Sequence, residues 1–396
     1  MFQLEEVVTP EPHADTSGTV IKVVGVGGAG GNAVEHMIRE GVGGVEFICC
    51  NTDAQALKKS SAPIKLQLGP GLGAGGKPEK AKELAKADRE RIAEALQGAH
   101  MVFITAGMGG GTGTGAGPVV AEVSRELGIL TVAVVTKPFE HEGKRKRTAE
   151  EGIAEMAQHV DSLIVILNEK LEEVLGEDVG MLDAFKAADN VLRNAVGGIA
   201  EIINVTGLVN VDFEDVKTVM NEMGKAMMGS ATAAGVDRAR IAAEEAVLSP
   251  LLEGIELSGA RGVLVNITAS STLGLREYKE VMKTIKQYTA AEATVICGAV
   301  FDESMEDRLR VTVVATGLGG AVKRVEKPKM VVVETVGLRT GTDNQPVYET
   351  VSQQHFDLTT VMSSARSTPR NSQAEAMAKS GVDTYDIPAF LRRQSD

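Results

Sequence analysis

Apolar runs alternate with helical patterns through the first half of the chain. Five short runs, rich in Val and Ile, are typical of strands that are buried on both faces of a parallel sheet. They are residues 19–26, 45–50, 101–106, 129–136 and 161–168. Patterns with apolar positions at helical spacing lie between them, at residues 33–40, 79–96 and 118–127. This alternation predicts an α/β fold built on a Rossmann-like parallel sheet.

The second half begins with a long helical pattern, residues 181–205, that is apolar on more than one face. We expect a central helix that connects two domains. A second, smaller α/β block follows, with strands expected at residues 226–232, 262–268, 293–300 and 309–316, and helices at residues 238–248 and 275–288. That block has no glycine loop, no metal-binding spacing and no nucleophile beside a base in its sequence, so we interpret it as a support domain.

The expected organisation is a flexible start (1–18), a nucleotide-binding domain (19–180), the central helix (181–205) and the support domain (206–317). Lys, Pro, Ser, Gln and Thr are then frequent in residues 318–382, which predicts a disordered linker. The last residues, 383–396, return to apolar anchors beside two arginines. This composition is typical of a docking peptide on a flexible tether, and equally of a frayed tail.

A glycine-rich stretch joins two of these elements, with seven glycines among the eleven residues 107–117. It lies between a buried strand and an apolar helix, unlike a flexible linker. Because glycine has no Cβ, several main-chain N–H groups can approach one anion, which also meets the positive end of the following helix. Thr112 and Thr114 add hydroxyls that can donate to phosphate oxygens. The stretch therefore predicts a phosphate-binding loop.

Two further glycine clusters follow apolar runs. Residues 25–30 satisfy G-x-G-x-x-G, and Asp53 lies where a ribose-binding acid would follow the second strand, so a dinucleotide-dependent oxidoreductase is an alternative. Residues 71–78 resemble a P-loop, but Pro78 replaces the hydroxyl that ligates magnesium, and we reject that motif. Pro78 suits the first turn of a helix instead. Three glycine loops in one half suggest a single phosphate chain that is approached from several sides.

Composition excludes several function classes. The net charge of -13 disfavours nucleic acid and anionic membrane surfaces as direct partners, and aromatic residues make up only 3%. No apolar run approaches the ~20 residues of a membrane-spanning helix, and the N-terminus lacks the pattern of a signal peptide, so we expect a cytoplasmic protein without direct membrane insertion. Cys49, Cys50 and Cys297 have no metal-binding spacing and are expected to be buried reduced thiols.

Two pairs of side chains suggest chemistry. Phe185 and Asp189 are four residues apart and share a helix face, where the carboxylate could accept from N1–H and N2–H of guanine while the ring stacks on the base. A core Phe and a solvated Asp are the alternative. Asp212 and Asp215 suit the N-cap and N3 positions of a helix, so capping alone could explain them.

Residues 109–115, Gly-Gly-Gly-Thr-Gly-Thr-Gly, are similar to the signature of the tubulin/FtsZ GTPase family. Residues 25–32, 51–53, 210–215 and 386–391 add to this resemblance, which covers about residues 20–317 and the tail. The resemblance implies that the substrate is GTP, with Mg²⁺ held mainly by phosphates and water and by no protein ligands. It places GTP on Gly28, Ala29, Gly30, Gly31, Asn32, Gly111, Thr112 and Gly113, near Ala74 and Gly75, with Glu142, Arg145 and Lys146 by the ribose and phosphates and Phe185 and Asp189 at the base.

The resemblance also implies head-to-tail filaments of the bacterial division ring. The turn carrying Asn210, Asp212 and Asp215 would enter the neighbour's nucleotide site and orient the attacking water. The protein would work in the cytoplasm, at the mid-cell ring on the inner face of the membrane, where division proteins and membrane tethers bind residues 383–396. The alternatives are the oxidoreductase above and a guanine-nucleotide-binding module without turnover.

Overall fold

The structure, a computed structural model, describes residues 18–175, 180–204, 211–222, 224–249, 259–290 and 292–318. Several parts for which the sequence makes predictions lie outside these residues. They are the flexible start up to residue 17, Asn210, and the linker and docking peptide from residue 319 onward.

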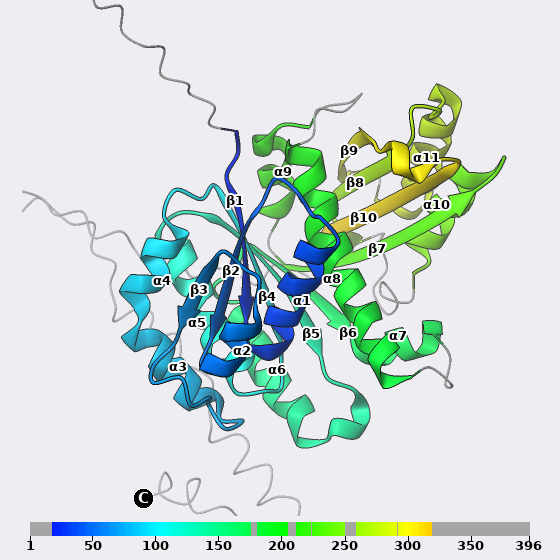
Figure 1. The fold of residues 1–396 in the computed structure, drawn as a ribbon. Coiled ribbons are helices and arrows are strands. Elements are labelled where there is room, and N and C mark those ends of the chain that lie inside the picture. The colour runs from blue at the N-terminus through cyan, green and yellow to red at the C-terminus, as the bar shows by residue number, and fades with distance from the viewer. Residues whose placement is uncertain are drawn as a thin grey trace, which may run out of the picture. The chain divides into compact units, whose positions relative to one another are not determined.

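In the described part of the chain, ten strands form one sheet in the order β3-β2-β1-β4-β5-β6-β7-β10-β8-β9 (Figure 1). The strands are β1 Ile21–Val26, β2 Glu46–Asn51, β3 Ile64–Gln67, β4 Met101–Gly107, β5 Leu130–Lys137, β6 Ser162–Leu167, β7 Gly224–Ala234, β8 Gly262–Ala269, β9 Thr294–Phe301 and β10 Arg308–Leu318. Strands β1 to β6 are all parallel, which confirms the Rossmann-like sheet predicted from the sequence. Their near-continuous apolar sequences fit burial on both faces.

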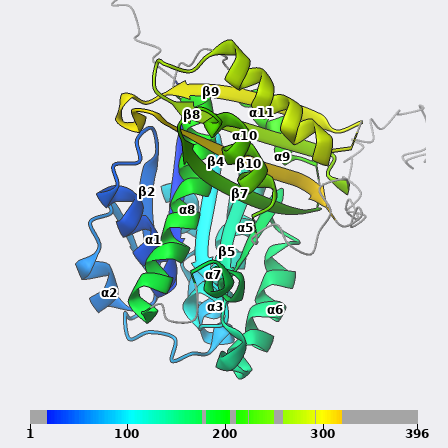
Figure 2. The same ribbon diagram turned by 90° about the vertical axis from the view of Figure 1, so that its right-hand side faces the viewer.

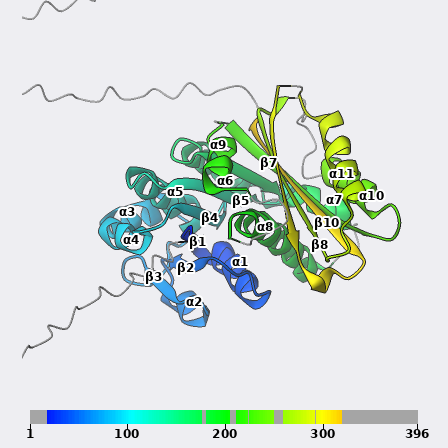
Figure 3. The same cartoon turned by 90° about the horizontal axis from the view of Figure 1, so that it is seen from above.

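Helices cover both faces of the parallel part. The α-helices of both halves of the sheet are α1 Gly27–Arg39, α2 Ala54–Lys59, α3 Pro78–Ala87, α4 Arg89–Leu96, α5 Thr112–Glu126, α6 Lys144–Met156, α7 Asn168–Leu175, α8 Met181–Asn204, α9 Phe213–Met220, α10 Arg238–Val247 and α11 Leu275–Tyr288. Side chains of α1 and α8 share a core with one face of β1 and β4, and side chains of α3, α4, α5 and α6 share a core with the other. Figure 3 shows α1 and α8 on one side of these strands and α3 and α5 on the other.

The second half differs in strand direction. β10 runs antiparallel to both β7 and β8, whereas β8 and β9 are parallel. β7 pairs with β6 over residues 162–164 and 224–226, so the sheet is continuous between the halves (Figure 2). Helices α10 and α11 pack on one face of the second half. Its other face, through Leu264 and Val314, joins the core that contains α8, so α8 packs against both halves.

Helix boundaries differ from the sequence prediction at three places. α1 begins at Gly27 and α5 at Thr112, inside glycine stretches that we expected to be loops. The single helix expected at residues 79–96 is two, α3 and α4, separated at Asp88. The Asp88 carboxylate accepts hydrogen bonds from the N–H of Gly69 and from Arg91. Pro78 does occupy the first turn of α3, as predicted.

Candidate functional site

The candidate site lies at the carboxyl ends of two neighbouring strands. β1 pairs with β4 over its whole length, so that Val26 lies beside Ala106 at the end of the pair. α1 follows β1 directly, and α5 follows β4 after a short loop. The backbones of the two helix starts approach closely, since a Cβ on Gly27 would lie 2.9 Å from the Gly113 nitrogen. Two positive helix N-termini are therefore adjacent, an arrangement that favours an anion.

Some of the glycines are needed to let backbone pack against backbone. A Cβ on Gly30 would lie 2.3 Å from the carbonyl oxygen of Thr105, and a Cβ on Gly113 would lie 2.5 Å from that of Gly107. These contacts explain how glycine-rich segments become helical, because close helix–strand packing compensates for the poor helix propensity of glycine. The space at Gly30 and Gly113 is already filled by the protein, so only their N–H groups could face a ligand.

Other glycines border open space. A Cβ on Gly28, Gly31 or Gly110 would meet nothing within 4 Å, and none of the three has a positive φ that would demand glycine. Packing and backbone conformation therefore do not explain the absence of a side chain at these positions. A ligand that lies against the backbone does explain it, and the cradle fits the phosphates of a nucleotide.

The third glycine loop joins the same site. The N–H of Gly73 donates to the Thr52 carbonyl at 2.8 Å, and the Thr52 hydroxyl lies 2.7 Å from the Thr112 hydroxyl. A Cβ on Gly111 would lie 3.0 Å from the Cβ of Ala74. The loop with Ala74 and Gly75 is thus held beside the first turn of α5. Thr52, which carries no motif that predicts a role, links β2, this loop and α5.

Three residues have structural roles at the cradle. Thr114, suggested above as a phosphate donor, is buried, and its hydroxyl accepts from the Gly109 N–H at 2.9 Å. Asp53, the acid of the oxidoreductase alternative, caps α2 by accepting from the Gln55 N–H at 2.8 Å. Ala29 packs against the backbone of Gly107. These contacts stabilise the turns that surround the cradle.

Acidic and basic side chains pair beside the cradle, where β5 leads into α6. Glu142 accepts from the N–H of Phe139 at 3.2 Å and from Arg145 at 2.7 Å, and Lys146 contacts Glu140. The main chain of the first turn of α6 contacts the glycine loop here, because a Cβ on Gly109 would lie 2.8 Å from the Arg145 carbonyl oxygen. The basic run at residues 144–147 starts a helix, which is one of its two predicted roles, and it lies next to the cradle.

Phe185 and Asp189 lie on α8, and the Asp189 carboxylate is electrostatically coupled to α1. Burial raises the pKa of Asp189 to about 6, while His36 and Arg39 on α1 act to lower it. Phe185 is 47% exposed and its ring meets Phe139 edge-on, with centroids 6.2 Å apart. No hydrogen-bond donor in the described part of the chain satisfies the Asp189 carboxylate. A partly desolvated carboxylate beside an exposed ring is suited to bind a base with two N–H donors.

The acidic turn lies at the other end of the same strands. Asp212 is the N-cap of α9 and accepts from the N–H of Asp215 at 2.8 Å, which confirms the predicted cap. The next residue, Phe213, packs its ring edge-on to His100, just before β4 begins. Figure 1 shows α9 near the start of β1, whereas α2 and α3 lie at the opposite end of the parallel strands. Both acids are exposed.

Comparison with known proteins identifies the family. The model described as Tubulin/FtsZ family, GTPase domain, matches residues 20–176, and the model described as FtsZ family, C-terminal domain, matches residues 224–319. A cell division protein FtsZ of Pseudomonas aeruginosa is 55% identical over 95% of this chain and 97% of its own length. That of Pseudomonas putida is 52% identical, with 100% of both chains covered. The chain belongs to the FtsZ family.

Solved structures agree with the FtsZ assignment. An empty FtsZ dimer of M. jannaschii has a TM-score of 0.73 and 45% identity, over 77% of this chain and 89% of that one. CetZ2 from Haloferax volcanii shares the fold, with a TM-score of 0.66 at 22% identity over 78% of this chain and 96% of its own. As a member of the FtsZ family the chain is a GTPase, which sets aside the oxidoreductase alternative.

Two other kinds of site are absent from the described residues. No three His, Cys, Asp or Glu side chains gather there to hold a metal ion. Within the same residues, no helix has the length and apolar character to cross a membrane. The three cysteines are buried and free, as expected, and burial raises the pKa of Cys50 to about 12.

Proposed function

We propose that this protein hydrolyses GTP between successive copies of itself in a head-to-tail filament that acts in cell division. One copy holds the nucleotide on the glycine cradle, with Asp189 and Phe185 at the guanine. The next copy contributes Asp212 and Asp215, which orient the attacking water. Asn210 is proposed to act with them, although it lies outside the described residues. Mg²⁺ is proposed to be held by the phosphates and water.

One observation carries this proposal: the cradle and the acids are at opposite ends of β4. The acids lie near His100 and the cradle begins after Gly107, so seven strand residues separate them. At about 3.3 Å per residue, the strand spans about 20 Å, which is far beyond hydrogen-bond reach. A single copy cannot bring the acids to its own nucleotide. Two copies stacked in the same direction can, and such a heterologous contact continues as an open filament.

The first test measures phosphate release and light scattering together as the protein concentration rises, with GTP and Mg²⁺ present. If the site is shared, release per molecule increases steeply where scattering begins, and dilute monomer is nearly inactive. Full turnover by demonstrably monomeric protein would overturn the proposal. Binding of GTP with assembly but no release at any concentration would instead favour the non-hydrolysing alternative.

A mixing experiment asks where the acids act. Asp215→Ala keeps an intact cradle, whereas Gly28→Leu fills the cradle and keeps both acids. Each variant alone is expected to hydrolyse GTP poorly. Mixed, they form interfaces that pair an intact cradle with intact acids, and activity should rise above the sum of the two. An additive result, with mixed filaments confirmed by co-sedimentation, contradicts catalysis between copies.

The C-terminal residues 383–396 are proposed to dock division proteins and membrane tethers, and so to place the filament at the mid-cell ring on the inner face of the membrane. The proposal rests on their composition, apolar anchors beside two arginines, and on the family. Deleting residues 383–396 should leave assembly and GTP turnover intact and abolish localisation to the division site, viewed with a fluorescent fusion. Loss of turnover in that deletion would contradict the docking role.

A further inference from the structure

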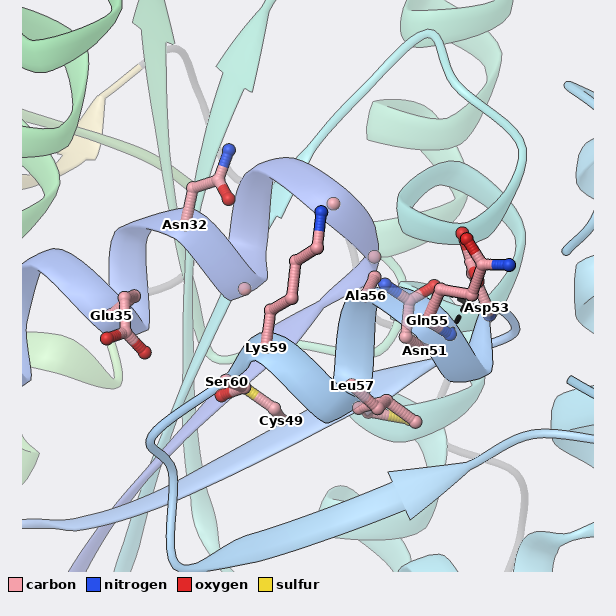
Figure 4. A pocket seen from close by; sticks show the side chains of 14 residues that line it. Asn32, Glu35, Cys49, Asn51, Asp53, Gln55, Ala56, Leu57, Lys59 and Ser60 are labelled. Carbon is pink, nitrogen blue, oxygen red and sulfur yellow. Dashed lines mark hydrogen bonds between the residues drawn. The ribbon is translucent and has the colours of Figure 1, made fainter.

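A cavity of about 350 Å³ lies between α1, α2 and the carboxyl end of β2, and it opens into the cradle. Gly27, Gly28 and Gly31 form its wall on the α1 side, so the cavity is continuous with the proposed phosphate site. On the α2 side, Lys59 extends across the opening toward α1, where Asn32 lies (Figure 4). No motif in the sequence singles out Lys59.

Lys59 is the one cation among the residues that line this cavity. The two carboxylates of the lining are already engaged, since Glu35 accepts from the N–H and the hydroxyl of Ser61 at 2.8 Å each, and Asp53 caps α2. Within the described residues, the Lys59 ammonium has no hydrogen-bond or ion-pair partner. An unpaired ammonium group in a cavity that reaches the N-terminus of α1 adds to a positive potential that is already suited to phosphate.

We infer that Lys59 binds the phosphate chain of the nucleotide from the α2 side of the cradle. This inference rests on the proposed GTP site and adds a contact to it. The cradle itself offers N–H groups and hydroxyls, whereas Lys59 supplies a full positive charge on a flexible stem. A charge-assisted contact of this kind increases affinity and makes it sensitive to salt.

Lys58 provides a matched control. Both lysines lie in the last turn of α2, where either can interact favourably with the helix C-terminus, and both are exposed. Only Lys59 lines the cavity. Replacing each by Gln removes the same charge from neighbouring positions, so a difference between the variants reports the direction of the side chain rather than the net charge of the protein.

The test measures GTP affinity of dilute, unassembled protein for the wild type, Lys59→Gln, Lys59→Arg and Lys58→Gln, at low and high salt. Lys59→Gln should bind about tenfold more weakly and with a shallower salt dependence, whereas Lys59→Arg and Lys58→Gln should stay within about twofold of the wild type. Thermal unfolding without nucleotide should be alike in Lys59→Gln and Lys58→Gln, because each change removes one charge from the last turn of α2.

Three outcomes overturn the inference while leaving the proposed function intact. They are equal GTP affinity of Lys59→Gln and the wild type, an equal loss in Lys58→Gln, and a loss in Lys59→Gln that Lys59→Arg fails to restore. Failure of the wild type itself to bind GTP would instead overturn the proposed function.

Discussion

The two ends of the parallel strands are built for opposite tasks. At the carboxyl end, α1 and α5 present adjacent N-termini, and glycines without side chains leave room for a ligand. At the amino end, α9 presents two exposed carboxylates. One end carries a positive potential and open space, and the other carries negative charge. Unlike ends therefore attract, so copies of the chain are expected to stack in one direction, and each polymer has two different tips.

The largest expected effect comes from removing one acid at the amino end. Asp215→Ala should reduce GTP turnover about 10²- to 10⁴-fold, in the range of a lost general acid–base contribution. GTP binding and filament formation should persist, because the cradle is at the other end and the cap of α9 uses only the backbone N–H of Asp215. Phosphate release and electron microscopy of filaments measure the two properties.

Glu214→Ala is the control for this change. Glu214 is exposed in the same turn and pairs with Lys217 at 2.9 Å, so its removal alters the local charge equally. Turnover of that variant should stay within a few-fold of the wild type. Normal turnover by Asp215→Ala would contradict the idea that the amino end supplies catalytic groups.

The next effect separates two kinds of glycine at the carboxyl end. Gly28→Leu places a side chain in open space, so GTP affinity should fall by about 100-fold or more while the unfolding temperature holds or rises slightly. Gly30→Ala places a Cβ 2.3 Å from the Thr105 carbonyl oxygen and should destabilise the fold by about 1–3 kcal/mol. Isothermal titration and thermal unfolding measure the pair. Strong GTP binding by Gly28→Leu would show that the nucleotide lies elsewhere.

The smallest effect concerns pH at the base site. The pKa of Asp189 is raised to about 6 from 3.8, so the folded state binds this proton more tightly than the unfolded chain. The Asp189 contribution to stability is therefore greatest below about pH 4 and is lost as the pH rises toward 6. GTP affinity should depend on pH in the opposite direction, because the N–H donors of guanine need the ionised carboxylate as their acceptor. The affinity should fall a few-fold from pH 7.5 to pH 5.

Asp189→Asn isolates this group from others that titrate in the same range, including the phosphates. The variant should bind GTP more weakly at pH 7.5 and lose less affinity on acidification than the wild type does. Its stability without nucleotide should also lack the decline between pH 4 and 6. Parallel pH profiles for the two proteins would show that Asp189 does not contact the base.

Most strands and several helices could be predicted because their sequences follow one period, whereas the short strand β3 was missed. The elements β8 and α11 match the prediction to within a residue, and α10 begins where expected. The cap by Asp212 was also predictable, because it depends on residues three positions apart. Each of these features depends on residues that are close in sequence, or on burial that follows one regular pattern along the whole element.

Features that depend on distant backbone contacts could not be predicted. The glycine-rich starts of α1 and α5 are helical because they pack against β4, as the Gly30–Thr105 contact shows, and propensity alone favours a loop. The link from Thr52 to Thr112 joins residues 60 positions apart. The cavity beside Lys59 likewise arises only when α1 and α2 are brought together by the sheet.

The direct path of β4 from His100 to the cradle has a mechanical consequence. The strand runs without interruption from its amino end, which would meet a neighbour's nucleotide, to its carboxyl end, beside the subunit's own nucleotide site. A hydrogen-bonded strand in the middle of a sheet resists stretching, so the axial period of a polymer would be set by the folded core. Salt, pH or tether length would then change how many subunits join while leaving their repeat distance constant.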